Sequence, residues 1–568
     1  KIKIVTMKKL YHLFLTFALL SAAGCNDFLD PDDDNSYKGD ELLTYIQRAE
    51  GVLLNAYASV PNANQISVMT DVATDNAVWN TSSGNAFRNI VSGEWSSTNN
   101  PFDKWSSAYT AIGYCNLFLD ELVDRVEWSY SDAWLCEAFR ERLTAEARGL
   151  RAYYYMELLT AHSGVGVNTG RLLGVPMIMH PIDVEEGDLD FPRDTYERCV
   201  ALVLEDLQFA IDHLPYEYKN NSEKPEEDRV YGARFANRLC GRIAMALKAR
   251  LLLQAASPAF NPDNDAAKWE AAAVAAAELI DASGGIDAID KSRIKFWLDD
   301  TSREIVWRKD YYTGRDWETT CFPPSLLGNG RMNPTQDFAD AFPYRNGVPY
   351  VPGNPSDPDD PYAGRDPRLD EYLIRNGSLF KDNVINTVDG DVDGIDRKPS
   401  SSTTTGYYMK KLMNPSVNHT TGSVVTTRHF HTLLRMTEVY LIFAEAANEA
   451  WGPDGQGTVG YSARDVIARI RSTGGITPDQ YLPTVATQAD MRRLIRNERR
   501  LELAFENQRF WDVRRWKDEQ AMMRAATGTR DGGKTAFEVE SRVFMDYMIY
   551  GPIPYDEQMK GLEQNRGW

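Results

Sequence analysis

Two stretches of the chain combine aromatic rings with polar side chains among turn-forming residues. The first, DNAVWNTSSGNAFRNIVSGEWSSTNN, covers 75–100, and the second, RKDYYTGRDWETTCFP, covers 308–323. Sugars offer flat C–H faces to aromatic rings and hydroxyls to polar side chains, so both stretches suit a glycan. The sequence predicts a glycan platform made of exposed Trp79, Trp95 and Trp317 with Arg88, Asn99, Tyr312 and Arg315 beside them. The alternative for each ring is packing in the core.

A second group of chemically capable residues lies between Glu498 and Arg515. Paired carboxylates in such a group could serve as general acid and base. However, Glu498 shares a helical face with Leu494, Leu501 and Phe505, and a carboxylate on a buried face must be paired. Arginines crowd the same helix. We therefore predict a buried ion-pair network that fixes helix packing, and no catalytic residues.

Two further patterns resemble metal sites. The acidic run DGDVDGID at 389–396 begins like a calcium loop, but its twelfth position is Ser400 and no helices flank it. Calcium binding and a plain acidic loop both stay open, and the second is favoured. His429 and His431 alternate in an expected strand and form at most a weak candidate pair. We expect no metal and no cofactor.

Helical periodicity dominates the segments that must position these residues. Apolar residues step by three and four within 105–119, 147–158, 240–255 and 436–447. Small and large residues alternate on these faces, which is typical of closely stacked helix pairs. The pattern suggests tetratricopeptide-like hairpins, although the chain keeps no strict 34-residue repeat.

The residue composition of the chain changes between residues 258 and 429. Gly, Pro, Asp and Asn cluster there in long loops, and loops on a rigid scaffold commonly carry function. Short strands are expected at 303–312 and 429–436, and helical periodicity resumes near residue 433. The loops, rather than the helices, are therefore the expected place of a binding site.

Composition excludes some classes of function. The 568 residues include 62 basic and 82 acidic ones, a net charge of −20, whereas nucleic acid binding needs a basic footprint. Five cysteines besides Cys25 form an odd set without CxxC spacing, so neither a disulfide framework nor a zinc site is indicated. The length predicts one or two packed units, because single cores rarely exceed about 300 residues.

The N-terminal residues have the layout of a secretory signal. Basic residues precede an apolar stretch at 10–23 that is too short to span a bilayer, and small residues then lead to Cys25. This arrangement resembles a bacterial lipobox. We expect a signal peptide at 1–24, translation starting at Met7, lipid on Cys25, and an acidic tether at 25–38.

Five motifs in order resemble the SusD/RagB family of outer-membrane nutrient-binding lipoproteins. They are EARGLRAYYYMELL (146–159), GRDPRL (364–369), LLRMTEVYLIFAEAANEA (433–450), NERRLELAFENQRFWDVRRW (497–516) and GPIPYDEQMKGLEQNRGW (551–568). Met436-Thr437 and Asn507 depart from the family pattern. Acidic residues after a lipidated cysteine also resemble the surface-export signal of Bacteroidetes lipoproteins.

The resemblance implies a mostly helical fold. About four tetratricopeptide-like hairpins, at 39–270, would pack against a loop-rich C-terminal part at 271–568 with a few short strands. It also implies a lipid-anchored protein on the outer surface of the outer membrane, partnered by a SusC-like TonB-dependent transporter. The usual ligand in the family is a glycan, and some relatives bind peptides.

These observations together predict a non-enzymatic glycan-binding lipoprotein that delivers oligosaccharide or polysaccharide to its transporter. A peptide-binding relative is one alternative. A secreted glycosidase is another, and it would need two apposed acids in a cleft. A helical-repeat scaffold that binds only proteins would lack exposed tryptophans.

Overall fold

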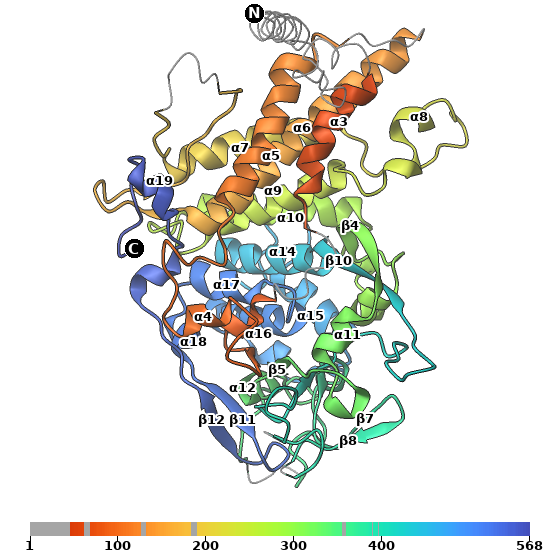
Figure 1. Ribbon diagram of the computed structural model, residues 1–568, viewed down its shortest axis with the longest axis vertical. Coiled ribbons are helices and arrows are strands. Elements are labelled where there is room, and N and C mark those ends of the chain that lie inside the picture. Colours follow the sequence, from red (N-terminus) through yellow and green to blue (C-terminus); the bar gives the residue numbers. More distant parts are fainter. Residues whose placement is uncertain are drawn as a thin grey trace, which may run out of the picture.

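The computed structural model describes residues 46–61, 69–126, 132–182, 190–354, 359–388, 390–395 and 397–568. The expected signal peptide, Cys25 and the acidic tether lie outside the described residues, as do Asp389 and Asp396. Long helices occupy one end of the molecule, and loops with short strands occupy the other (Figure 1). The predicted fold class, mostly helical with a few short strands, is confirmed.

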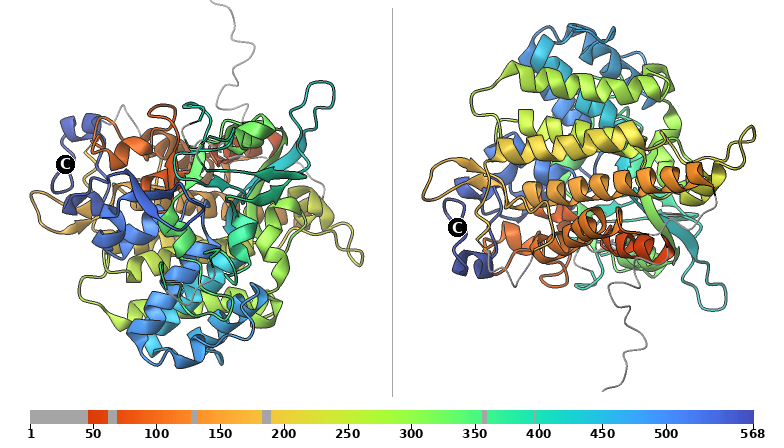
Figure 2. Two further views of the ribbon diagram at one scale, coloured as in Figure 1. Left: turned by 90° about the horizontal axis from the view of Figure 1, so that it is seen from below. Right: turned by 90° about the horizontal axis from the view of Figure 1, so that it is seen from above.

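The long helices of the protein form a stack. Its members are α3 (Ile46–Ala58), α5 (Trp105–Leu117), α6 (Ala133–His162), α7 (Tyr196–His213), α9 (Gly241–Ala256), α10 (Ala266–Ala282), α14 (Met436–Trp451), α15 (Ala463–Thr473) and α16 (Gln488–Glu502). Each of α5, α6, α7, α9, α10 and α14 packs against the next, and the long helices lie side by side in Figure 2. This order matches the expected stacking of helical hairpins, and it carries the stack into the C-terminal part of the chain.

Shorter helices and turns connect and cover this stack. The short α-helices are α4 (Arg88–Val91), α8 (Asp228–Tyr231), α11 (Asp316–Cys321), α12 (Gln336–Asp340), α13 (Arg368–Tyr372), α17 (Arg509–Arg515), α18 (Glu519–Met523) and α19 (Tyr555–Met559). The π-helix is η3 (Phe118–Leu122), and the 3-10 helices are η2 (Thr70–Ala73), η4 (Ala233–Phe235), η5 (Ile286–Ala288), η6 (Lys291–Leu298), η7 (Pro324–Leu326), η8 (Leu482–Thr484) and η9 (Asp546–Ile549).

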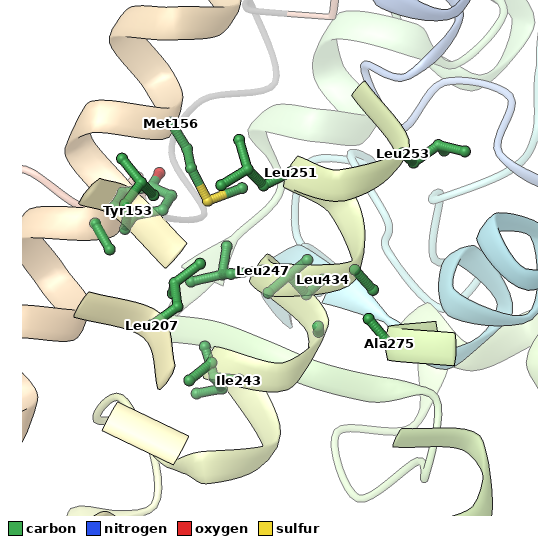
Figure 3. Packing of buried hydrophobic residues seen from close by; sticks show 14 of the residues in the cluster. Tyr153, Met156, Leu207, Ile243, Leu247, Leu251, Leu253, Ala275 and Leu434 are labelled. Atoms are coloured by element: carbon green, nitrogen blue, oxygen red, sulfur yellow. The ribbon is translucent and has the colours of Figure 1, made fainter. Parts of the chain in front are cut away.

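The apolar stripes of the helices meet in one core. Leu247 and Leu251 stand one turn apart on α9 and are buried, with Tyr153 and Met156 of α6 and Leu207 of α7 beside them (Figure 3). Burial of each leucine stabilises the fold by about 1.5–3 kcal/mol. Local capping supports the same helices. The Asp132 carboxylate, for example, accepts the Trp134 backbone N–H at 3.0 Å at the start of α6.

The strands form short antiparallel pairs. They are β1 (Ala77–Trp79) with β5 (Met332–Pro334), β2 (Gly164–Val165) with β3 (Leu172–Leu173), β6 (Leu373–Ile374) with β9 (Tyr408–Met409), β7 (Ser378–Phe380) with β8 (Asn383–Ile385), and β11 (Ala526–Thr529) with β12 (Ala536–Glu540). The longest pair is β4 (Ile305–Gly314) with β10 (Thr427–Arg435), in which Tyr312 lies opposite His429. The two predicted strands are confirmed by this ribbon, which leads directly into α14.

The predicted ion-pair network lies beneath α16. Both carboxylate oxygens of the buried Glu498 are paired, one with Arg368 at 2.9 Å and the other with Arg471 at 2.7 Å. Burial of Glu502 opposes its ionisation, but Arg293 and other guanidiniums outweigh that effect and hold the Glu502 pKa below its ordinary value. The prediction of a structural network is confirmed, since every acid here has a basic partner in the core.

Among the described residues, none of the helices combines the length and the apolar character that crossing a bilayer requires.

Candidate functional site

The three tryptophans of the predicted platform are core residues. Trp79, Trp95 and Trp317 are only 6, 3 and 5% exposed and belong to the apolar cluster of the loop-rich part. The expectation that these rings are exposed is therefore wrong. The turn-rich stretches bury their rings in a second core against residues from distant parts of the chain, although the composition of these stretches is polar.

Trp95 shows how this second core closes. Its ring makes edge contacts with Phe510 and with Trp568, at ring-centre distances of 5.9 and 4.8 Å. The indole N–H donates to the Asn100 side-chain oxygen at 2.9 Å, so its polar group is also satisfied. Residues from near the C-terminus thus cover a ring that the local sequence places in a loop.

Trp317 is held between α11 and the long ribbon. Its indole stacks on the imidazole of His429, whose Nε2 lies 3.2 Å from a carboxylate oxygen of Glu318. The cavity beside Trp317 measures about 30 Å³, which is room for one or two water molecules and not for a sugar ring. His429 is engaged in this packing, which argues against the weak alternative of a metal pair with His431.

Arg88 and Asn99, two polar members of the predicted site, hold their own loops. The Arg88 guanidinium donates to the Glu540 carboxylate at 2.8 Å and joins α4 to β12. The side-chain amide of the exposed Asn99 donates to the Glu94 carbonyl at 3.0 Å. Both bonds shape the surface of the 75–100 stretch.

Tyr312 and Arg315 lie on the ribbon and at its end. Both side chains are half-buried, and the Tyr312 hydroxyl donates to Asp316. This hydrogen bond raises the Tyr312 pKa above its ordinary value, so the hydroxyl keeps its proton at neutral pH. Of the predicted set, Tyr312, Arg315, Arg88 and Asn99 keep part of their side chains at the surface, whereas the three tryptophans do not.

The structure brings together a group at the ribbon that includes Tyr311 and Arg308 of the 308–323 stretch but none of the residues predicted for the glycan platform. Tyr311 is 40% exposed, and the guanidiniums of Arg308 and Arg428 lie 4.0 and 4.5 Å from its ring centre. Arg428 also donates to Asp300 at 2.8 Å. That hydrogen bond lowers the Asp300 pKa, so its carboxylate is an acceptor at neutral pH. We call these four residues the Tyr311 cluster.

The chemistry of the Tyr311 cluster suits a polyhydroxylated ligand. The arginines hold the tyrosine ring in a fixed orientation through cation–π contacts and leave N–H donors beside it. Asp300 supplies acceptor oxygens in the same place. Arg308 and Arg428 come from two strands that are far apart in the sequence and meet only through the register of β4 and β10. The local sequence around either residue therefore does not predict this arrangement.

The described part of the acidic loop engages its own chain. Asp393 accepts the Ser325 backbone N–H at 2.8 Å, and Asp391 accepts the Asn386 amide at 3.0 Å. These bonds fit the plain acidic loop, which was the favoured interpretation.

Comparison with known proteins agrees with the fold and the motifs. The SusD family matches residues 303–568, and a family described as starch-binding associating with outer membrane matches residues 27–235. SusD-like protein P25 of Formosa agariphila is 24% identical over 439 residues, which is 73% of this chain and 70% of that protein.

Solved structures show the same fold. A SusD-like protein from Bacteroides fragilis is 23% identical, with a TM-score of 0.72 over 95% of this chain and 100% of its own. A SusD-like carbohydrate binding protein from Bacteroides fragilis is 21% identical, with a TM-score of 0.69 over 91% of this chain and 98% of its own. Family matches to both parts of the sequence, a shared fold and five ordered motifs lead to one conclusion: this chain belongs to the SusD family, whose members are binding proteins and not enzymes.

Proposed function

We propose that this protein captures a glycan at the cell surface and passes it to a SusC-like TonB-dependent transporter in the outer membrane. The observation that carries the ligand site is Tyr311, an exposed aromatic ring held between two arginines with a carboxylate beside it. Family membership supports the ligand class, because one matched family is described as starch-binding and one similar structure as carbohydrate binding.

The ligand site is accordingly moved from the tryptophans to the Tyr311 cluster. Of the residues predicted from sequence, Arg315 stays in the proposed site because it is half-buried at the end of the same ribbon, whereas Tyr312 follows Tyr311 directly on β4 and therefore faces the other side. The proposed contacts are stacking at the tyrosine ring and hydrogen bonds from arginine to sugar hydroxyls. Affinity at such an open surface is expected in the roughly micromolar to millimolar range.

The test is affinity electrophoresis of wild type and Tyr311→Ala in gels that contain starch or laminarin, followed by calorimetry with the retarding glycan. We expect retardation of wild type and its loss in Tyr311→Ala. Tyr555→Ala is the matched control, because Tyr555 is similarly exposed, at 45%, on the distant helix α19. Retention of binding by Tyr311→Ala contradicts the proposed site, and binding of peptides but of no glycan supports the peptide-binding alternative.

Anchoring and delivery are tested separately. Radiolabelled palmitate is expected to enter wild type and not Cys25→Ala, and equal labelling of both contradicts lipidation. A tagged wild-type chain is expected to co-purify from outer membranes with a TonB-dependent transporter. Uptake of the glycan by cells that lack this protein is expected to fall. Normal uptake in such cells contradicts the delivery role.

A further inference from the structure

A polar groove lies next to the Tyr311 cluster, and apart from Arg308 and Asp300 its lining has no role in the function proposed above. Its cavity measures about 570 Å³, within the range of about 300–1,000 Å³ that holds small-molecule ligands. One wall is the α7–α9 connection, which carries α8, and the other is the connection from α10 to β4. Buried Met436 and Tyr440 of α14 form its floor.

The groove contains an aromatic surface in a fixed position. Tyr216 is 37% exposed, and its hydroxyl is hydrogen-bonded to the Ser283 hydroxyl on the opposite wall at 2.8 Å. An anchored ring loses little conformational freedom when a ligand stacks on it. Exposed Asn237, Ser292 and Thr301 add amide and hydroxyl groups to the lining. The groove thus offers an aromatic face with both donors and acceptors around it.

The charges of the groove favour a neutral ligand. Its lining contains four acids and four bases, namely Glu217, Asp290, Asp300 and Glu304 with Lys219, Arg242, Arg303 and Arg308. Several are already neutralised within the protein. Glu217 lies 3.0 Å from Arg242, and Glu304 lies 3.0 Å from Arg435. An anionic ligand would need an excess of basic groups, whereas balanced donors and acceptors suit sugar hydroxyls.

The groove is continuous with the Tyr311 cluster. Arg308 and Asp300 line the groove, and the same two residues belong to the cluster. One chain of linked sugars can therefore contact both places without leaving the surface. Two linked contacts bind much more tightly than either alone, because the second contact forms at a high effective concentration.

We propose that this groove is a second carbohydrate subsite, which holds units of the same neutral polysaccharide beyond those at Tyr311. This inference rests on the proposed function. A second subsite makes affinity depend on glycan length, because a short oligosaccharide contacts only the Tyr311 cluster, whereas a polysaccharide contacts the cluster and the groove.

The test uses two variants of the groove in the full chain. Tyr216→Ala removes the anchored ring, and Ala236→Trp fills the groove from an exposed position on its lining. Both are compared with Tyr555→Ala, and thermal melting verifies that each variant is folded. For starch or laminarin, whichever binds wild type, we expect each groove variant to weaken binding by about tenfold or more. Binding of the corresponding trisaccharide is expected to stay unchanged.

The outcomes separate this inference from the proposed function. Wild-type polysaccharide binding by both groove variants, with loss in Tyr311→Ala, overturns the groove and keeps the Tyr311 site. Loss of polysaccharide binding in both groove variants, with wild-type binding by Tyr311→Ala, supports the groove and overturns the Tyr311 site. Hydrogen–deuterium exchange gives an independent readout, because polysaccharide should protect 214–219 and 298–304 in wild type. Unchanged exchange in these segments, or no binding of any glycan by wild type, overturns the inference.

Discussion

The indole of Trp317 stacks on the imidazole of His429, with ring centres 5.0 Å apart and planes inclined by 20°. Trp317 belongs to α11 and His429 to β10, so this contact fastens the loop-rich part to the ribbon that bears the Tyr311 cluster. Trp317, which the sequence analysis placed in the glycan platform, is thus a buried packing residue beneath the surface.

The first prediction concerns this support. Trp317→Ala is expected to lower the free energy of unfolding by about 3–5 kcal/mol, the usual cost of removing a large buried ring. Urea denaturation measures the change, and Trp134→Ala, which removes an exposed tryptophan from α6, is the control. Unchanged stability together with lost glycan binding would return Trp317 to the ligand site.

The second prediction concerns the buried ion pairs. Glu498→Ala leaves Arg368 and Arg471 short of a partner in the core, so we expect a loss of about 3–5 kcal/mol in the free energy of unfolding. The control is Glu270→Ala, at an exposed position on α10. A variant as stable as wild type contradicts the structural role of the network.

The third prediction concerns pH and His162. This imidazole is fully buried, and its Nδ1 lies 2.7 Å from the Pro552 carbonyl. Burial lowers its pKa from the ordinary 6.5 to about 4, so the folded protein keeps it neutral. Between these two values the unfolded chain binds more protons than the folded one. Stability therefore falls as pH falls from 6.5 toward 4, by at most about 3 kcal/mol from this group.

Urea denaturation across this pH range checks the effect of His162. The slope of stability against pH is expected to become shallower in His162→Gln, even if that variant is less stable at every pH. In His180→Gln, which changes an exposed histidine, the slope should stay as in wild type. Identical slopes in all three proteins contradict the assignment to His162.

The fourth prediction separates the roles of Arg88. Its guanidinium is bonded to Glu540, so Arg88→Ala is expected to cost about 1 kcal/mol of stability and to leave glycan affinity unchanged. Calorimetry and thermal melting measure the two effects on one preparation. A drop in affinity without a drop in melting temperature would restore Arg88 to the glycan site.

The sequence by itself determined the helical architecture and the family. The stripe of 240–255 became α9, with Leu247 and Leu251 in the core, because apolar periodicity acts over a few neighbouring residues and needs no distant partner. The burial of Glu498 was predictable for the same reason. Its helical face is apolar, but its partners Arg368 and Arg471 come from distant parts of the chain, so only the tertiary structure identified them.

Only the tertiary structure decided which aromatic rings face the solvent. Trp95 is buried because Phe510 and Trp568 cover it, and Trp317 is buried because the imidazole of His429 covers it. Tyr311 stays exposed beside arginines of two paired strands. Exposure of a ring depends on segments that are distant in sequence and adjacent in space, and local composition carries no information about that contact. The candidate binding surface is therefore determined by tertiary packing, whereas the helices beneath it are predicted by the apolar periodicity of the sequence.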